Sequence, residues 1–205
     1  MDVFSPTKLY IALLHHPVKN KNGEIIASAV TNLDLHDISR IAKTYGVGSF
    51  YVVTPLDDQR ALVEKIISHW TEGGGGTYNP KRRDALNLVR VKESLNQVID
   101  DIKKETSGNI KIVATSADEK QQSLGFGEFR RCLEETENAY LLVFGTAWGL
   151  TDEFLGSADF VLEPIKGHSG YNHLPVRAAV AIILDRIIRG YYGKDQTDRK
   201  RTITA

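Results

Sequence analysis

Three segments in the second half of the chain end an apolar, strand-like run in glycine or small polar residues. They are residues 112–117, 140–153 and 160–177. In an open α/β sheet, ligands bind outside the carboxyl ends of the strands, so we expect a binding site where these runs end. Gly145 and Gly149 stand in the second segment. Glycines there leave backbone amides and carbonyls open to a ligand.

Three polar residues could take part in a reaction. Asp152 follows the segment with the two glycines and could accept a proton from an acceptor group, or it could cap a helix. Arg40 could bind a phosphate or lower the pKa of an acceptor, or it could form a surface ion pair. Asn172 could hydrogen-bond a base or a cofactor, or it could order its own loop as an asparagine turn. The residues alone leave each pair of alternatives open.

One basic cluster, Lys81, Arg82 and Arg83, follows a run of four glycines, Gly73–Gly76. Four consecutive glycines have too much backbone freedom for a helix or strand, so we expect a mobile loop there. The cluster could bind RNA phosphates or be solvated surface charge. Net charge does not decide between these, because 26 basic residues balance 26 acidic ones.

Apolar runs alternate with segments of helical period, a pattern typical of a parallel sheet covered by helices. The predicted strands are residues 9–14, 49–53, 87–91, 110–115, 139–144 and 159–162. The predicted helices are residues 35–46, 56–70, 92–106, 124–134 and 176–191. We expect one domain over residues 1–205, with a loosely ordered tail from about Lys194.

Several classes of protein are disfavoured by composition. Cys132 is the only cysteine, which excludes an internal disulfide and a four-thiolate zinc site and favours a cytoplasmic location. No apolar run is long enough to span a bilayer, so no membrane partner is expected. The adjacent pair His15-His16 lacks the spacing of a zinc motif, so we expect no metal.

The three segments, in this order and at this spacing, resemble the cofactor half of SPOUT methyltransferases, in particular the bacterial RNA methyltransferase domains related to the tRNA guanine methyltransferases. Residues 31–47 are similar to the first motif of that superfamily, with Arg40 at the arginine position and Tyr45 and Gly46 after it. Residues 140–153 resemble the second motif, and the loop through Asn172 resembles the third. The resemblance covers residues 9–192.

This resemblance implies an α/β fold with a mostly parallel, five- to six-stranded sheet, helices on both faces and a deep C-terminal trefoil knot. It implies a homodimer that transfers a methyl group from S-adenosylmethionine to a base or ribose of tRNA or rRNA. Arg40, Asp152 and Asn172 would be catalytic, and Lys81, Arg82 and Arg83 would bind the RNA. The cofactor would contact Thr115, Ser116, Gly145, Thr146, Trp148, Gly149, Leu162, Pro164, Ile165, Gly167, His173 and Leu174.

The sequence departs from the family pattern on the acceptor side. Many relatives carry a glutamate after the first glycine of the second motif, where this chain has Thr146, Ala147 and Trp148. The methylated RNA, nucleotide and atom therefore stay open, as does the identity of the general base. Two rival readings are a Rossmann-type nucleotide enzyme and a catalytically silent RNA-binding domain that keeps the fold. The first rival is weakly supported, because Gly46-Val47-Gly48 and Gly125-Phe126-Gly127 lack the third glycine of a dinucleotide motif.

Overall fold

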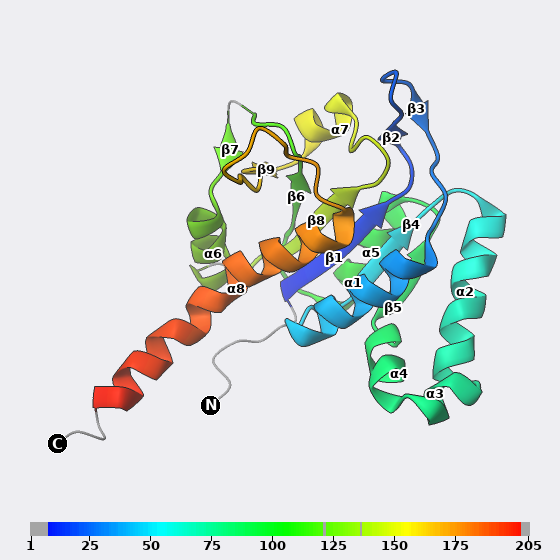
Figure 1. Cartoon of the computed structure of the whole chain (residues 1–205), viewed down its shortest axis with the longest axis horizontal. Coiled ribbons are helices and arrows are strands. Elements are labelled where there is room, and N and C mark those ends of the chain that lie inside the picture. Colours follow the sequence, from blue (N-terminus) through cyan, green and yellow to red (C-terminus); the bar gives the residue numbers. More distant parts are fainter. Residues whose placement is uncertain (1–7, 121, 136, 202–205) are drawn as a thin grey trace.

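The structure is a computed structural model that describes residues 8–120, 122–135 and 137–201, and within these ranges the side chains up to Ile188. Figure 1 shows a central sheet with helices packed against both of its faces. Helix α8 extends away from this body toward the C-terminus.

The sheet is parallel throughout its described strands. Its order is β5-β4-β1-β8-β6-β9-β7, and each neighbouring pair runs in the same direction. The strands are β1 (Leu9–Leu14), β4 (Phe50–Val53), β5 (Val89–Lys92), β6 (Ile110–Thr115), β7 (Ser123–Leu124), β8 (Ala139–Gly145) and β9 (Phe160–Leu162). The prediction of a mostly parallel α/β sheet is confirmed.

The predicted strand count of five to six was too low, because the described residues form a seven-stranded sheet. The additional strand is β7, whose two residues are too few to show a pattern in the sequence. A separate antiparallel pair, β2 (Val18–Lys19) with β3 (Ile25–Ile26), follows β1. The trefoil knot stays a prediction.

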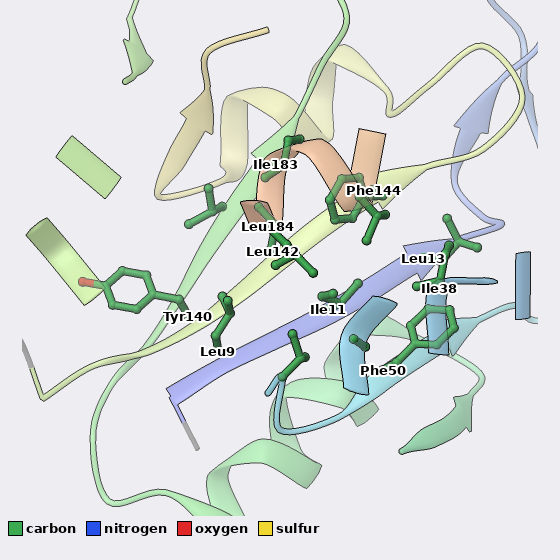
Figure 2. Close-up of a cluster of buried hydrophobic side chains, with 14 of the residues drawn as sticks. Leu9, Ile11, Leu13, Ile38, Phe50, Tyr140, Leu142, Phe144, Ile183 and Leu184 are labelled. Carbon is green, nitrogen blue, oxygen red and sulfur yellow. The ribbon is translucent and has the colours of Figure 1, made fainter. Parts of the chain in front are cut away.

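Alternate side chains of β1 point to opposite faces of the sheet, and each set is buried in its own apolar cluster. Leu9, Ile11 and Leu13 face a cluster that includes residues of α1, α6 and α8, and Figure 2 shows Ile38, Ile183 and Leu184 of these helices over the strands. Tyr10, Ala12 and Leu14 face the other cluster. Strands buried on both faces read as continuous apolar runs, which is why the sequence located them.

The helices divide unequally between the two faces. The first face is covered by α1 (Asn32–Thr44), α2 (Asp57–Thr71), α4 (Pro80–Leu86), α6 (Phe126–Glu135) and α8 (Val176–Arg201). The second is covered by α5 (Leu95–Glu105) and α7 (Asp152–Ser157). Helix α8 ends ten residues after the predicted Tyr191, and its backbone continues past Lys194. No described helix is both long and apolar enough to cross a membrane.

The expectation of a mobile glycine loop was wrong. Gly74–Tyr78 forms the short helix α3, in which Gly75 and Gly76 are buried. A Cβ on Gly75 would lie 2.9 Å from Cε3 of Trp70, and one on Gly76 would lie 2.5 Å from the carbonyl oxygen of Trp70. These two glycines are needed for close packing between α2 and α3, which outweighs the entropy lost by ordering them.

We therefore predict that Gly76→Ala destabilises the fold by about 2 kcal/mol, because the added methyl group overpacks the contact with Trp70. Gly74→Ala is the matched control, since a Cβ at Gly74 meets nothing within 4 Å. That control should be neutral or stabilise the fold by up to about 1 kcal/mol, because alanine is the better helix former. Urea unfolding measures both effects, and equal stabilities of the two variants would contradict the packing role.

Candidate functional site

The three sequence segments meet at one edge of the sheet. β6 lies between β8 and β9, and all three strands are parallel, so their carboxyl ends are neighbours. Thr115 pairs in register with Leu162, and its Oγ1 donates a hydrogen bond to the carbonyl oxygen of Val143 at 3.0 Å. Thr115, Gly145 and Leu162 therefore lie at the ends of neighbouring strands, at one edge of the sheet. Their contact with a cofactor stays a prediction.

Side chains connect the loops that leave these strands. The Nδ2 group of Asn172 donates to the carbonyl oxygen of Ala117 at 2.7 Å, and Lys166 forms an ion pair with Glu119 at 2.7 Å. Both contacts join the loop 163–175 to the loop after β6. Lys120 of that second loop lies 3.6 Å from Asp152, at the start of α7. The three segments form one continuous rim around the strand ends.

The turn after β8 has a strained, closed backbone. The amide of Gly149 donates to the carbonyl of Thr146 at 2.8 Å, and both Ala147 and Gly149 have positive φ, at 51° and 94°. A Cβ on Gly145 would lie 2.6 Å from the backbone nitrogen of Leu150. Gly145 is therefore required for the turn to close on itself, whereas the sequence suggested that it leaves space for a ligand. Positive φ at an alanine costs energy and marks a functional candidate.

A buried chain of hydrogen bonds connects this turn to the end of β1 and to the segment after β3. Thr146 Oγ1 donates to the carbonyl of Leu14 at 3.0 Å and lies 2.5 Å from Ser28 Oγ, which lies 3.0 Å from His15 Nδ1. Each hydroxyl has one proton, so Ser28 donates to Thr146, and His15 must donate from Nδ1. Nε2 of His15 is then an acceptor; it is buried without a hydrogen-bond partner among the described atoms. The imidazole is therefore neutral.

Burial lowers the pKa of His15 to about 4, and the neighbouring Asp34 carboxylate opposes this effect only in part. Burial has this effect because it removes the charged imidazolium from water, and backbone groups of Ser28 and Ala29 oppose it only in part. From the sequence, His15 was considered only as part of the pair His15-His16, which lacks the spacing of a zinc motif. Its partner Ser28 lies thirteen residues away in the sequence and Thr146 lies much further away. No local sequence pattern therefore indicates this chain of hydrogen bonds.

The same edge is braced by an ion-pair cluster that the sequence did not reveal. Arg177, in the first turn of α8, contacts Asp34 Oδ1 at 3.3 Å and Asp37 Oδ2 at 3.4 Å. Thr31 caps α1 by accepting from the amide of Asp34, and its hydroxyl donates to Oδ2 of that residue at 2.7 Å. The first turn of α1 is thereby fixed against the first turn of α8.

Asp152, the candidate base, does not cap α7. Thr151 does so, because its Oγ1 accepts from the amide of Phe154. Oδ1 of Asp152 instead lies 3.5 Å from the ammonium group of Lys19 and 3.6 Å from that of Lys120, with 75% of the side chain exposed. The carboxylate is accessible from the rim, and two cations share one of its oxygens.

Exposure separates the predicted cofactor residues into two groups. Trp148 is 64% exposed and Leu174 is 43% exposed, and Gly167 and His173 are also exposed. Leu162 and Pro164 are buried, and Ile165 packs against the core. Large apolar side chains held at the surface of a strand-edge site are suited to an adenine ring, and the open glycine backbone is suited to polar groups. The residues present therefore fit S-adenosylmethionine.

The structure does not bring the other predicted residues to this edge. Arg40 lies six residues beyond Asp34, about 9 Å along α1, and borders a cavity formed with α2 and α4. Arg82 borders the same cavity, Arg83 forms an ion pair with Asp84 at 3.8 Å, and Lys81 is exposed. Among the described residues, no three His, Cys, Asp or Glu side chains are grouped as a metal site requires.

Residues 8–189 match a protein family described as SAM-dependent RNA methyltransferase. The chain is 45% identical over 180 residues to a tRNA (guanine-N(1)-)-methyltransferase of Oleidesulfovibrio alaskensis, covering 88% of this chain and 42% of the relative. It is 39% identical to an uncharacterized protein of Aquifex aeolicus, covering 87% of each. The chain thus spans less than half of the first of these relatives.

Solved structures share the fold at low sequence identity. A probable methylase family protein of Haemophilus influenzae aligns with a TM-score of 0.63 at 18% identity, over 94% of this chain and 70% of that one. The SpoU methyltransferase AviRb of Streptomyces viridochromogenes, solved with AdoMet, aligns with a TM-score of 0.54 at 16% identity, over 93% and 60%. The fold is that of SPOUT methyltransferases.

The buried imidazole predicts a pH dependence of stability. Its folded pKa of about 4 lies below its ordinary value of 6.5, so the unfolded chain binds the proton more tightly. The contribution of His15 is complete above pH 6.5 and is lost as the pH falls toward 4, by up to about 3 kcal/mol.

His15→Asn should flatten this part of the profile of unfolding free energy against pH. The matched control is His16→Asn, because His16 is exposed and adjacent; it should keep the wild-type slope. Burial also lowers the pKa of His36, so part of the slope should remain in both variants. Identical slopes in the His15 and His16 variants would show that His15 is not the group that titrates.

Proposed function

Because the chain belongs to the family of SAM-dependent RNA methyltransferases, we propose that it transfers a methyl group from S-adenosylmethionine to tRNA at the strand edge of β6, β8 and β9. The observation that carries this proposal is the continuous rim formed by residues 115–120, 145–152 and 163–175, with Trp148 and Leu174 exposed on it. A cytoplasmic location is part of this proposal, because tRNA is the proposed substrate.

S-adenosylmethionine, when bound, supplies an electrophilic methyl group on a sulfonium centre. Trp148 and Leu174 would hold the adenine, with backbone groups of the turn at Gly145–Gly149 and of the loop at Ile165 and Gly167 hydrogen-bonding its edge. The hydrogen-bonded chain from His15 through Ser28 to Thr146 keeps that turn in its strained form. Preorganisation of this kind lowers the cost of aligning reactants.

The acceptor must lose a proton to become nucleophilic. The rim carries four carboxylates, Asp118, Glu119, Asp152 and Glu163. We propose Asp152 as the base, because it follows the turn at Gly145–Gly149 and its side chain is 75% exposed. Lys19 and Lys120 fix the position of this carboxylate beside the cofactor loops. Asn172 holds the loop 163–175 to Ala117, so we propose that it orders the site as well as contacting the base. We propose guanine as the acceptor, because the relatives from Oleidesulfovibrio alaskensis and Nitratidesulfovibrio vulgaris are named tRNA (guanine-N(1)-)-methyltransferases.

Two further features are part of this proposal. Arg40 faces α2 and α4, away from the rim of its own chain, so we propose that it acts on an acceptor held by the second subunit of a homodimer. In α8, Val180, Ile183 and Ile187 are buried against the same chain, and Val176 also packs against its core. Ala179 and Ile182, both half-buried, are left for a partner. In the trefoil knot that we propose, α8 would be threaded through the loop between the second and third motifs.

The cofactor site is tested by Trp148→Ala. Its exposed indole has no role in the apolar core, so the variant should keep the wild-type melting temperature and lose about tenfold in S-adenosylmethionine affinity by calorimetry. Tyr78→Ala, which removes an exposed aromatic from α3, should bind as the wild type does. Wild-type protein that gives no binding heat at millimolar ligand would overturn the proposed function.

The shared site is tested by mixing two inactive variants. Arg40→Ala removes the acceptor-side guanidinium, and Gly145→Val breaks the turn because its Cβ collides with Leu150. Refolded mixtures should regain part of the methyl transfer to tRNA, measured with tritiated cofactor, because one of the two composite sites is intact. A dimer whose mixtures stay inactive would confine Arg40 to its own subunit, and a fully active monomer would exclude the shared site.

A further inference from the structure

A cavity of about 840 Å³ lies between α1 and α2, with α4 at one end, and we call it the α1–α2–α4 pocket. Figure 1 shows these helices on the side of the molecule away from β7, β9 and the loop 163–175. The pocket is lined by Asn32, Leu33, His36, Asp37 and Arg40 of α1, Leu62, Lys65, Ile66, His69 and Trp70 of α2, and Arg82 of α4.

The pocket carries a net positive charge. Arg40, Lys65 and Arg82 line it, and none of them forms an ion pair with another described residue. The acidic residue of the lining, Asp37, is engaged by Arg177 at 3.4 Å. The three cations are thus arranged around a space in which an anion would be stabilised.

Two buried nitrogen atoms at the same place have no hydrogen-bond partner. They are Nδ1 of His36 and Nε of Arg82, two of the three such side-chain atoms in the described part of the chain. Burial lowers the pKa of His36, and Arg82 and Arg40 add to this effect. Buried polar groups without partners are costly. A phosphate oxygen can accept from the Nε–H of Arg82, and the edge of a nucleotide base, which carries both donors and acceptors, can pair with Nδ1 of His36 in either tautomer.

The walls of the pocket offer an apolar surface on which a nucleotide base can pack. Leu33 is 61% exposed and Leu62 is 43% exposed, and both are large apolar side chains on the pocket. The guanidinium of Arg82 lies 4.6 Å from the ring centre of Trp70 and is held there by its π face. A guanidinium plane fixed in this way is a platform on which an unstacked RNA base can lie.

From this juxtaposition of cations, unpartnered nitrogen atoms and apolar wall, we propose that the α1–α2–α4 pocket binds one unpaired, phosphate-bearing nucleotide of the RNA, outside the methyl-transfer rim of its own chain. The inference rests on the proposed function and specifies the substrate as single-stranded at this point. Bases of a double helix stay stacked, and their edges lie in grooves too narrow or too shallow to present a base to a cavity.

The test uses intrinsic fluorescence of the full chain. The sequence has two tryptophans, so Trp148→Phe leaves Trp70 of the pocket as the only one. In this background, a single-stranded oligoribonucleotide should change the fluorescence of Trp70 at a concentration at which the corresponding duplex does not. A duplex that acts as well as the single strand would overturn the proposal.

Leu62→Glu, added to this background, places a negative charge on the pocket wall and should weaken the binding of the single strand about tenfold, through lost stacking and repulsion of the phosphate. Leu56→Glu is the matched control, since Leu56 is equally exposed, at 43%, and precedes α2 outside the pocket. It should bind as the background does, and equal affinities in the two variants would contradict the proposal.

Calorimetry with S-adenosylmethionine, performed on the protein with both tryptophans, separates this inference from the proposed function. Cofactor binding without an effect of Leu62→Glu on the RNA would overturn only the pocket. Absence of cofactor binding would overturn the methyltransferase proposal, whatever the fluorescence of Trp70 shows. Unfolding curves of Leu62→Glu and Leu56→Glu should agree, because both side chains lie at the surface.

Discussion

The pairing of β1 with β8 joins two segments that are far apart in the sequence, along six consecutive residues from Leu9 with Tyr140 to Leu14 with Gly145. Everything at the strand edge depends on this register. It places the carbonyl oxygen of Leu14 where it accepts two hydrogen bonds from Thr146, one from the backbone amide at 3.2 Å and one from the hydroxyl at 3.0 Å. A shift by one residue would turn the side chains of β1 to the opposite faces and remove both bonds.

Much of the fold could be predicted because the main strands are buried on both faces and stand out as apolar runs. The elements that were missed are short. The strands β2, β3 and β7 have two residues each, and the helices α3, α4 and α7 have five, seven and six, too few to show a period. The glycine run shows a different limit. The sequence indicates only that the run has much backbone freedom. Contact with Trp70, which exists only in the folded chain, decides that the run forms helix α3.

The candidate site was predictable where it follows the strand ends, and less so where it depends on contacts distant in sequence. Thr115, Gly145 and Leu162 lie together because parallel neighbours end together. Arg177 and Asp34 are 143 residues apart, and their ion pair has no trace in composition or spacing. Arg40 and Arg82 were singled out for separate reasons, and their place in one cavity follows from the packing of α1, α2 and α4.

The turn after β8 is built partly from the hairpin of β2 and β3. The amide of Lys19 donates to Gly149, the amide of Trp148 donates to Lys19, and Val18 bridges Leu150. The motif segment is thus one side of a small backbone ladder whose other side comes from the first twenty residues. Residues 140–177 are consequently not a self-contained unit. Transferred into a related scaffold, they would keep their conformation only if the hairpin of β2 and β3 were transferred as well.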